Sequence, residues 1–155
     1  YFENMVAELA ALQKAPCDIG VRRAFAHSCM LSADVSAGYD PAFPSVFEKL
    51  NAAYIGSGIC INKYTGSGGK SGSNDANAEY LQEIRHLFDT NKVVWQTAEL
   101  GMIDAGGTIA YILAKYGTEV VDCGVPVLSM HAPIELVSKA DILMAYRAYR
   151  AFLKR

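Results

Sequence analysis

The last third of the sequence shows the pattern that decides the fold. Two short apolar runs, Val120-Val-Asp-Cys123 and Val127-Leu-Ser-Met130, precede a long amphipathic stretch from Pro133 to about Lys154. Short apolar runs are typical of buried strands, and apolar residues three or four positions apart are typical of a helix packed against a sheet. The predicted apolar stripe of that helix is Val137, Ala140, Met144, Ala148 and Phe152, and its solvated stripe is Arg147, Arg150 and Lys154.

The same alternation continues toward the start of the sequence. The predicted elements are helices at 1–14, 18–28, 75–90 and 108–115, and strands at 30–35, 58–64 and 93–97. Strands that alternate with helices in this way predict an α/β layer fold with a largely parallel sheet.

Composition limits the classes of protein to consider. With 155 residues, 52% of them hydrophobic and 19% charged, the chain suits one domain with a buried core. A net charge of −2 does not favour nucleic-acid binding, and no apolar run approaches the roughly 20 residues that cross a bilayer. The sequence begins with Tyr1 and not Met, so we expect a piece of a longer protein. The four cysteines (Cys17, Cys29, Cys60 and Cys123) are expected to be buried thiols in a reducing compartment.

Two side chains with metal-binding chemistry follow predicted strands. Asp34 lies at the carboxyl end of the strand at 30–35, and His131 directly follows the run that ends at Met130. Ligands collect at the carboxyl ends of strands in open α/β sheets, and a carboxylate with an imidazole suits zinc. Structural roles, a capping Asp and a hydrogen-bonded His, remain the alternative. His27 and His86 fall within helical patterns and are expected to be structural.

A glycine-rich segment at 65–74 contains Gly69-Lys70-Ser71 between a predicted strand and a predicted helix, as a phosphate-binding loop does. The full motif needs a glycine five positions before Gly69, where this sequence has Tyr64. A surface loop is therefore favoured, and phosphate binding stays a weaker alternative.

Several separated segments together resemble one family. They are Leu31-Ser-Ala-Asp-Val-Ser36, Lys63-Tyr-Thr-Gly-Ser-Gly-Gly-Lys-Ser-Gly-Ser-Asn-Asp75, Val94-Trp-Gln-Thr97 and Val121-Asp-Cys-Gly-Val-Pro-Val-Leu-Ser-Met-His-Ala-Pro133. In this order they resemble the zinc metallo-aminopeptidases that include aspartyl aminopeptidase and vacuolar aminopeptidase I, in particular the bacterial aminopeptidase I branch. The resemblance covers nearly all of residues 1–155 as the C-terminal part of a catalytic domain, with no separate second domain.

The resemblance implies an α/β/α sandwich with a mixed, mostly parallel sheet, incomplete in this chain. It implies an enzyme that removes N-terminal residues from peptides, using two zinc ions, an activated water and a glutamate as general base. It also implies a cytoplasmic homo-oligomer, a dodecamer in the complete enzyme, with no nucleic-acid or membrane partner. The other class left open is a non-catalytic scaffold or assembly module in which Asp34 and His131 are vestigial.

The family's motifs also assign residues. By resemblance, Asp34 and His131 are metal ligands on different zinc ions, and Lys63, Gly106 and Gly107 lie near the substrate. The other three ligands and the catalytic glutamate are expected before Tyr1, so the isolated chain is expected to be inactive. Where aspartyl aminopeptidases have a histidine three residues after the metal aspartate, this sequence has Ala37, so a preference for acidic N-terminal residues does not follow.

Overall fold

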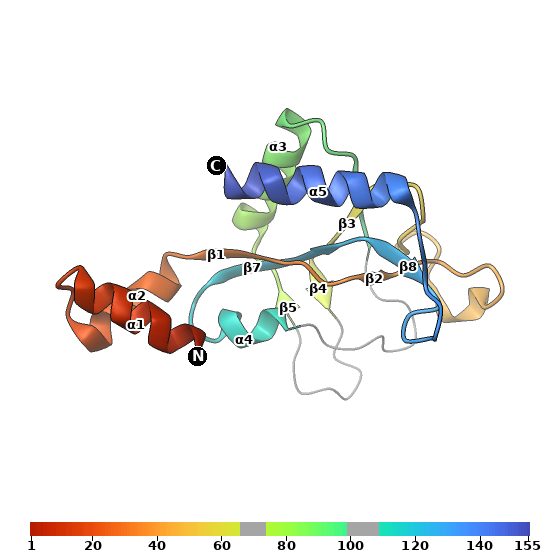
Figure 1. Ribbon diagram of the computed structural model, residues 1–155. Coiled ribbons are helices and arrows are strands. Elements are labelled where there is room, and N and C mark those ends of the chain that lie inside the picture. The colour runs from red at the N-terminus through yellow and green to blue at the C-terminus, as the bar shows by residue number, and fades with distance from the viewer. Residues whose placement is uncertain (66–73, 99–108) are drawn as a thin grey trace.

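The computed structural model describes residues 1–65, 74–98 and 109–155. Its main sheet has four strands, in the order β1-β7-β3-β6 (Figure 1). Strand β7 is parallel to β1 and antiparallel to β3, and β3 is parallel to β6, so the predicted mixed α/β sheet is confirmed. The strands are β1 (Cys29–Ser32), β7 (Glu119–Gly124), β3 (Ile59–Asn62) and β6 (Trp95–Thr97).

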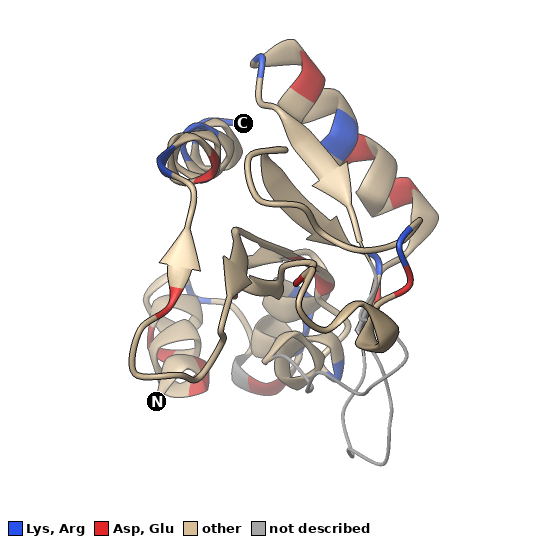
Figure 2. Cartoon of the chain, turned by 90° about the vertical axis from the view of Figure 1, so that its right-hand side faces the viewer, with Lys and Arg blue, Asp and Glu red and all other residues tan. Residues whose placement is uncertain are grey.

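Helices lie on both sides of this sheet. Figure 1 shows α3 and α5 above it, with α4 below and the α1–α2 pair beyond the start of β1. Acidic and basic residues are interspersed along the helices (Figure 2). The helices are α1 (Phe2–Leu12), α2 (Cys17–Ala26), α3 (Ala78–Thr90), α4 (Ala110–Ala114) and α5 (Lys139–Leu153), with a 3₁₀ turn η1 (Pro44–Val46).

The main core lies between the sheet and the α3–α5 layer. Alternate strand residues point to the same face, so Ile59 and Ile61 of β3 lie beside Val121 and Cys123 of β7. Tyr80, Ile84 and Phe88 of α3 and Ala145 and Ala148 of α5 pack on them. The intervening residue Cys60 belongs to a separate small cluster with Ala53 and Ala98, because it faces the other way. Cys60 and Cys123 are buried, as predicted, whereas Cys29 is half-buried.

A second, smaller sheet continues from the first. It contains β2 (Ser36–Ala37), β8 (Pro126–Leu128) and β9 (Leu136–Val137), with β2 parallel to β8 and β9 antiparallel to it. Figure 1 shows β1 running on into β2 and β7 into β8, so the two parallel pairs form one ribbon. A short hairpin pairs β4 (Tyr64–Thr65) with β5 (Asn74–Asp75).

Several predicted boundaries were wrong. The helix expected at 75–90 begins at Ala78, because Asp75 belongs to β5. The strand expected at 30–35 ends at Ser32, because the chain kinks there before it resumes as β2. The helix expected from Pro133 begins only at Lys139, because β9 occupies part of the interval and the Ser138 hydroxyl caps the helix by accepting from the Ala140 amide at 3.2 Å. Val137 therefore lies on a strand and not on the predicted helical stripe.

Asp141, in the first turn of α5, links this helix to the loop before β3. Its fully buried carboxylate accepts hydrogen bonds from the amides of Gly56 (2.7 Å) and Gly58 (2.8 Å). Replacing it by alanine leaves two amides without their acceptor, so we expect Asp141→Ala to lower the free energy of unfolding by about 2–4 kcal/mol. Denaturant unfolding measures this, with Asp141→Asn, which keeps one acceptor oxygen, losing less. Equal stability of Asp141→Ala and wild type would contradict the assignment.

Among the described residues, no helix combines the length and apolar character that crossing a bilayer requires.

Candidate metal centre

Asp34 lies where β1 gives way to β2. It is exposed, and its Oδ1 accepts a hydrogen bond from the Val35 amide at 2.8 Å. The register of the ribbon is the same on both sides of it, with Ser32 opposite Asp122 and Ser36 opposite Pro126. Asp34 is therefore level with Gly124 of β7. At this kink residues 33–35 are exposed, whereas Ser32 and Ser36 on either side are buried.

Close approach of the two backbones holds this kink. A Cβ placed on Gly124 would overlap the carbonyl oxygen of Asp34, so a residue without a side chain is needed at Gly124. Just beyond, the Ser36 amide donates to the Val125 carbonyl at 2.9 Å and closes the ladder again.

His131 follows β8 after a tight turn. The Ala132 amide donates to the Ser129 carbonyl at 2.9 Å, and the His131 amide donates to Glu135 Oε1 at 2.6 Å. Ser129 (φ 58°) and His131 (φ 68°) both have left-handed backbone, which is uncommon for residues other than glycine. Such conformations gather at functional sites, where the surrounding contacts impose them. His131 thus lies on a turn whose backbone is fixed by these hydrogen bonds, and its side chain is exposed.

The ribbon places the two predicted ligands on neighbouring segments without direct contact. Asp34 precedes β2, whereas His131 follows β8, the parallel partner of β2. Ala37 is three positions after Asp34, which is roughly 10 Å along an extended strand. Ala37 pairs with Val127 before the chain turns toward His131. The two side chains thus flank one stretch of the ribbon, offset along its axis.

Tyr149 of α5 reaches the same region from the helical layer. Its hydroxyl donates to the Cys123 carbonyl at 2.8 Å, next to Gly124. Burial chiefly, and then the nearby Cys123 thiol and Asp34 carboxylate, raise the pKa of the Tyr149 hydroxyl well above its usual value. Tyr149 therefore remains protonated at neutral pH and keeps donating to the strand that supports the kink.

Three buried polar residues lie side by side across the main sheet, beginning two positions before Asp34. Ser32, Asp122 and Asn62 occupy facing positions on β1, β7 and β3, and all three are buried. Asn62 Oδ1 accepts from the Ser36 hydroxyl at 2.7 Å, and Asn62 Nδ2 donates to the Ala98 carbonyl at 2.7 Å. Sequence reasoning missed this row. The signal available was a polar residue inside each of two apolar runs, Ile59-Cys-Ile-Asn62 and Val120-Val-Asp-Cys123.

The predicted substrate residues are only partly placed. Lys63 follows Asn62 at the end of β3, is exposed, and forms an ion pair with Asp75 of the β4–β5 hairpin. Gly106 and Gly107 lie outside the described residues, as does most of the glycine-rich segment with Gly69-Lys70-Ser71.

The donor chemistry of Asp34 and His131 fits zinc, although the described part of the chain supplies few ligands. A carboxylate oxygen and an imidazole nitrogen are both common zinc ligands. Within residues 1–65, 74–98 and 109–155, no group of three or more His, Cys, Asp or Glu side chains gathers in a metal-binding arrangement. Zinc sites use three or four protein ligands, so Asp34 and His131 fit as part of a site.

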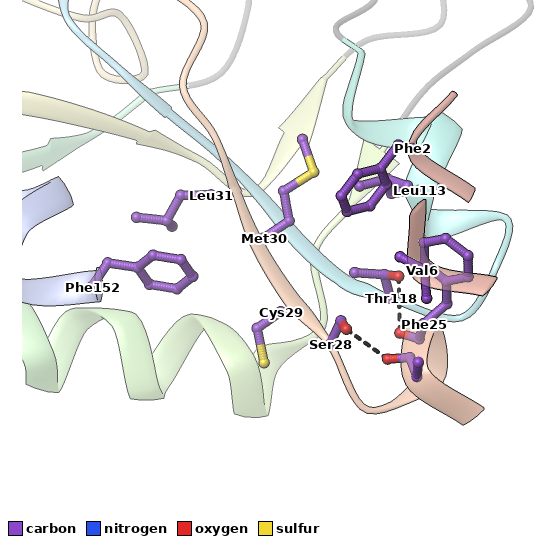
Figure 3. Close-up of a pocket in the computed structure, with 11 residues that line it drawn as sticks. Phe2, Val6, Phe25, Ser28, Cys29, Met30, Leu31, Leu113, Thr118 and Phe152 are labelled. Carbon is purple, nitrogen blue, oxygen red and sulfur yellow. Dashed lines mark hydrogen bonds between the residues drawn. The ribbon is translucent and has the colours of Figure 1, made fainter. Parts of the chain in front are cut away.

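The apolar pocket drawn in Figure 3 lies elsewhere, alongside β1 and the α1–α2 pair. It has a volume of about 380 Å³ and is lined by residues such as Phe2, Phe25, Met30, Leu31 and Leu113. Of the predicted site residues that the structure describes, Asp34, His131 and Lys63 do not line it. A smaller hollow of about 290 Å³ borders the ribbon at Ala37, Val127 and Met130, next to the turn that carries His131.

A mixed α/β sheet with a carboxylate and an imidazole beyond two strand ends has the features of a metal-binding α/β protein. A family model described as aminopeptidase I zinc metalloprotease (M18) matches residues 1–153, and the chain belongs to this family. A probable M18 family aminopeptidase 1 from Clostridium acetobutylicum is 56% identical over 155 residues, which are 99% of this chain and 33% of the relative. The chain thus spans about a third of the length of the curated relatives that it matches.

Solved structures agree. The crystal structure of aminopeptidase I from Clostridium acetobutylicum is 54% identical, with a TM-score of 0.88, and covers 99% of this chain and 33% of its own. The M18 family aminopeptidase of Thermotoga maritima is 35% identical, with a TM-score of 0.92, and covers 99% and 35%. A structure described as the dodecamer of Saccharomyces cerevisiae mApe1 shares the fold at 24% identity and a TM-score of 0.70, covering 92% and 30%.

Proposed function

We propose that the longer protein containing this chain is a zinc aminopeptidase, and that residues 1–155 form the C-terminal part of its catalytic domain. Family membership supports the activity class. The observation that carries the proposal is structural: the two expected ligands are exposed residues at opposite ends of the paired strands β2 and β8, Asp34 just before β2 and His131 after β8. The chain spans a third of its relatives, which leaves room elsewhere for the remaining ligands and the glutamate general base.

In this proposal the Asp34 carboxylate and the His131 imidazole hold two different zinc ions. The two side chains follow different strands, so each is assigned to its own ion, and the ions of paired sites lie about 3.5–4 Å apart. When bound, zinc polarises the peptide carbonyl and acidifies a water molecule. The Val35 amide holds one oxygen of Asp34, and the other oxygen is proposed to bind the metal. The Glu135 carboxylate and the backbone of the turn fix where the imidazole of His131 is presented.

Lys63, Gly106 and Gly107 are proposed to lie on the peptide side of this centre. Lys63 extends the strand that carries Asn62, and its ammonium group, held by Asp75, is exposed for contact with a peptide. The proposal further includes a cytoplasmic homo-oligomer. The fold shared with the mApe1 dodecamer supports an assembly of this kind.

Metal removal tests the function. The purified longer protein should release N-terminal residues from aminoacyl-anilides, lose that activity after treatment with a zinc chelator, and regain it when zinc is restored. Asp34→Asn keeps the shape of the side chain but makes it a weaker ligand. In this variant, zinc should restore no more than about 1% of wild-type turnover. Residues that only support a ligand typically cost about 10–100-fold, so this loss would be larger. Full restoration in Asp34→Asn would favour the scaffold alternative with vestigial ligands.

A further inference from the structure

The side chain of Asn62 makes a link that the proposed function leaves unexplained. It is buried at the carboxyl end of β3, and both ends of its amide group are used. Its oxygen accepts from the Ser36 hydroxyl and its nitrogen donates to the Ala98 carbonyl, each at 2.7 Å. Asn62 lies in the main sheet and Ser36 in the smaller one, so this is a side-chain bridge between the two sheets.

The bridge ends two residues from Asp34. Residues 33–35 are exposed, but the residues that bound them, Ser32 and Ser36, are buried. The Ser36 amide is already held by the Val125 carbonyl, so the hydroxyl bond to Asn62 fixes the same residue from a second direction. The far end of the short exposed segment is therefore anchored both to its parallel partner and to β3.

We propose that Asn62 is a positioning residue that holds Asp34 in the geometry needed to bind metal. This inference rests on the proposed function, because it assumes that Asp34 is a ligand. Metal ligands must be held within about 0.5 Å of their working position, and an exposed three-residue segment does not hold itself so closely. A buried hydroxyl that loses its partner must find another, and movement of Ser36 toward water moves Asp34 with it.

The test measures zinc affinity, which does not require activity. The longer protein is stripped of metal, and its zinc affinity is measured by competition with a chromogenic chelator for Ser36→Ala, Asn62→Leu and the double variant. We expect each single substitution to raise the Kd of the zinc ion held by Asp34 by about 10–100-fold. This is the usual effect of losing a group that orients a ligand. Because both act through one bond, the double variant should be no weaker than Asn62→Leu alone.

Two further variants separate positioning from general stability. Ser36→Thr keeps the hydroxyl and should bind zinc within about threefold of wild type. Gln96→Leu removes another well-bonded amide, since Gln96 accepts from the Tyr54 amide at 2.8 Å and donates to the Tyr54 and Gly58 carbonyls at 2.8 and 3.0 Å. It should lower stability about as much as Asn62→Leu does and leave zinc affinity unchanged.

The outcomes are distinct. Wild-type zinc affinity in both Ser36→Ala and Asn62→Leu, or the same loss in Gln96→Leu, overturns the positioning role. If Asn62→Leu does not fold, the comparison of Ser36→Ala with Ser36→Thr decides. Asp34→Asn is measured in parallel: if it also binds zinc normally, the proposed function fails, whereas if it alone loses zinc, only the role of Asn62 fails.

Discussion

Replacing Gly124 by alanine in the longer protein should abolish zinc binding at Asp34 and destabilise the fold. The new Cβ would overlap the Asp34 carbonyl oxygen, and backbone rather than a flexible side chain would have to move. Overpacking costs about 1–3 kcal/mol in general, and we expect the upper end of this range here. Zinc content after dialysis and denaturant unfolding measure the two effects.

Gly56→Ala is the matched control. Gly56 has a left-handed backbone (φ 87°) with no heavy atom within 4 Å of an added Cβ. Alanine there costs about 1–2 kcal/mol through backbone conformation alone, so stability should fall while zinc content stays at the wild-type level. Wild-type zinc content in Gly124→Ala would show that the close contact with Asp34 does not control the site.

The second large effect is expected for His131→Ala. Removing the imidazole deletes a proposed ligand from an exposed turn, so turnover of aminoacyl-anilides by the zinc-loaded longer protein should fall by more than about 100-fold, beyond the range for residues that only support ligands. Folding should be little changed, because the turn is held by backbone hydrogen bonds at Ala132 and His131 and not by the ring. Steady-state kinetics and thermal unfolding together separate the two effects.

His86→Ala provides the comparison for this variant. His86 is exposed on α3, which carries neither of the proposed ligands, and no role is assigned to it. Its loss should leave turnover within about twofold of wild type. Near-normal hydrolysis by His131→Ala would reject the ligand assignment whatever His86→Ala does.

The sequence predicted the elements better than their ends or their pairing. Periodicity located the strands and helices because it reports which faces are buried. It could not show that the strand before Asp34 ends at Ser32. That break depends on Gly124, which is distant in sequence and lies opposite Asp34 only in the folded chain. It also extended the last helix back to Pro133, because the residues of β9 are apolar enough to continue the stripe.

For the candidate site, the sequence predicted the proposed ligands but not the contacts that surround them. Asp34 and His131 were predicted from their positions after strands, and the remaining assignments came from the family resemblance. Asn62, Ser36 and Gly124 were missed because their roles arise from register between strands distant in sequence. A polar residue inside an apolar run marks such a position but does not name its partner.

Anomalous diffraction at the zinc absorption edge, on crystals of the longer protein, tests the ligand assignment most directly. We predict two zinc peaks about 3.5–4 Å apart, one within about 2.2 Å of an Asp34 carboxylate oxygen and the other equally near an imidazole nitrogen of His131. Zinc peaks that both lie beyond bonding distance of these two side chains would contradict the account.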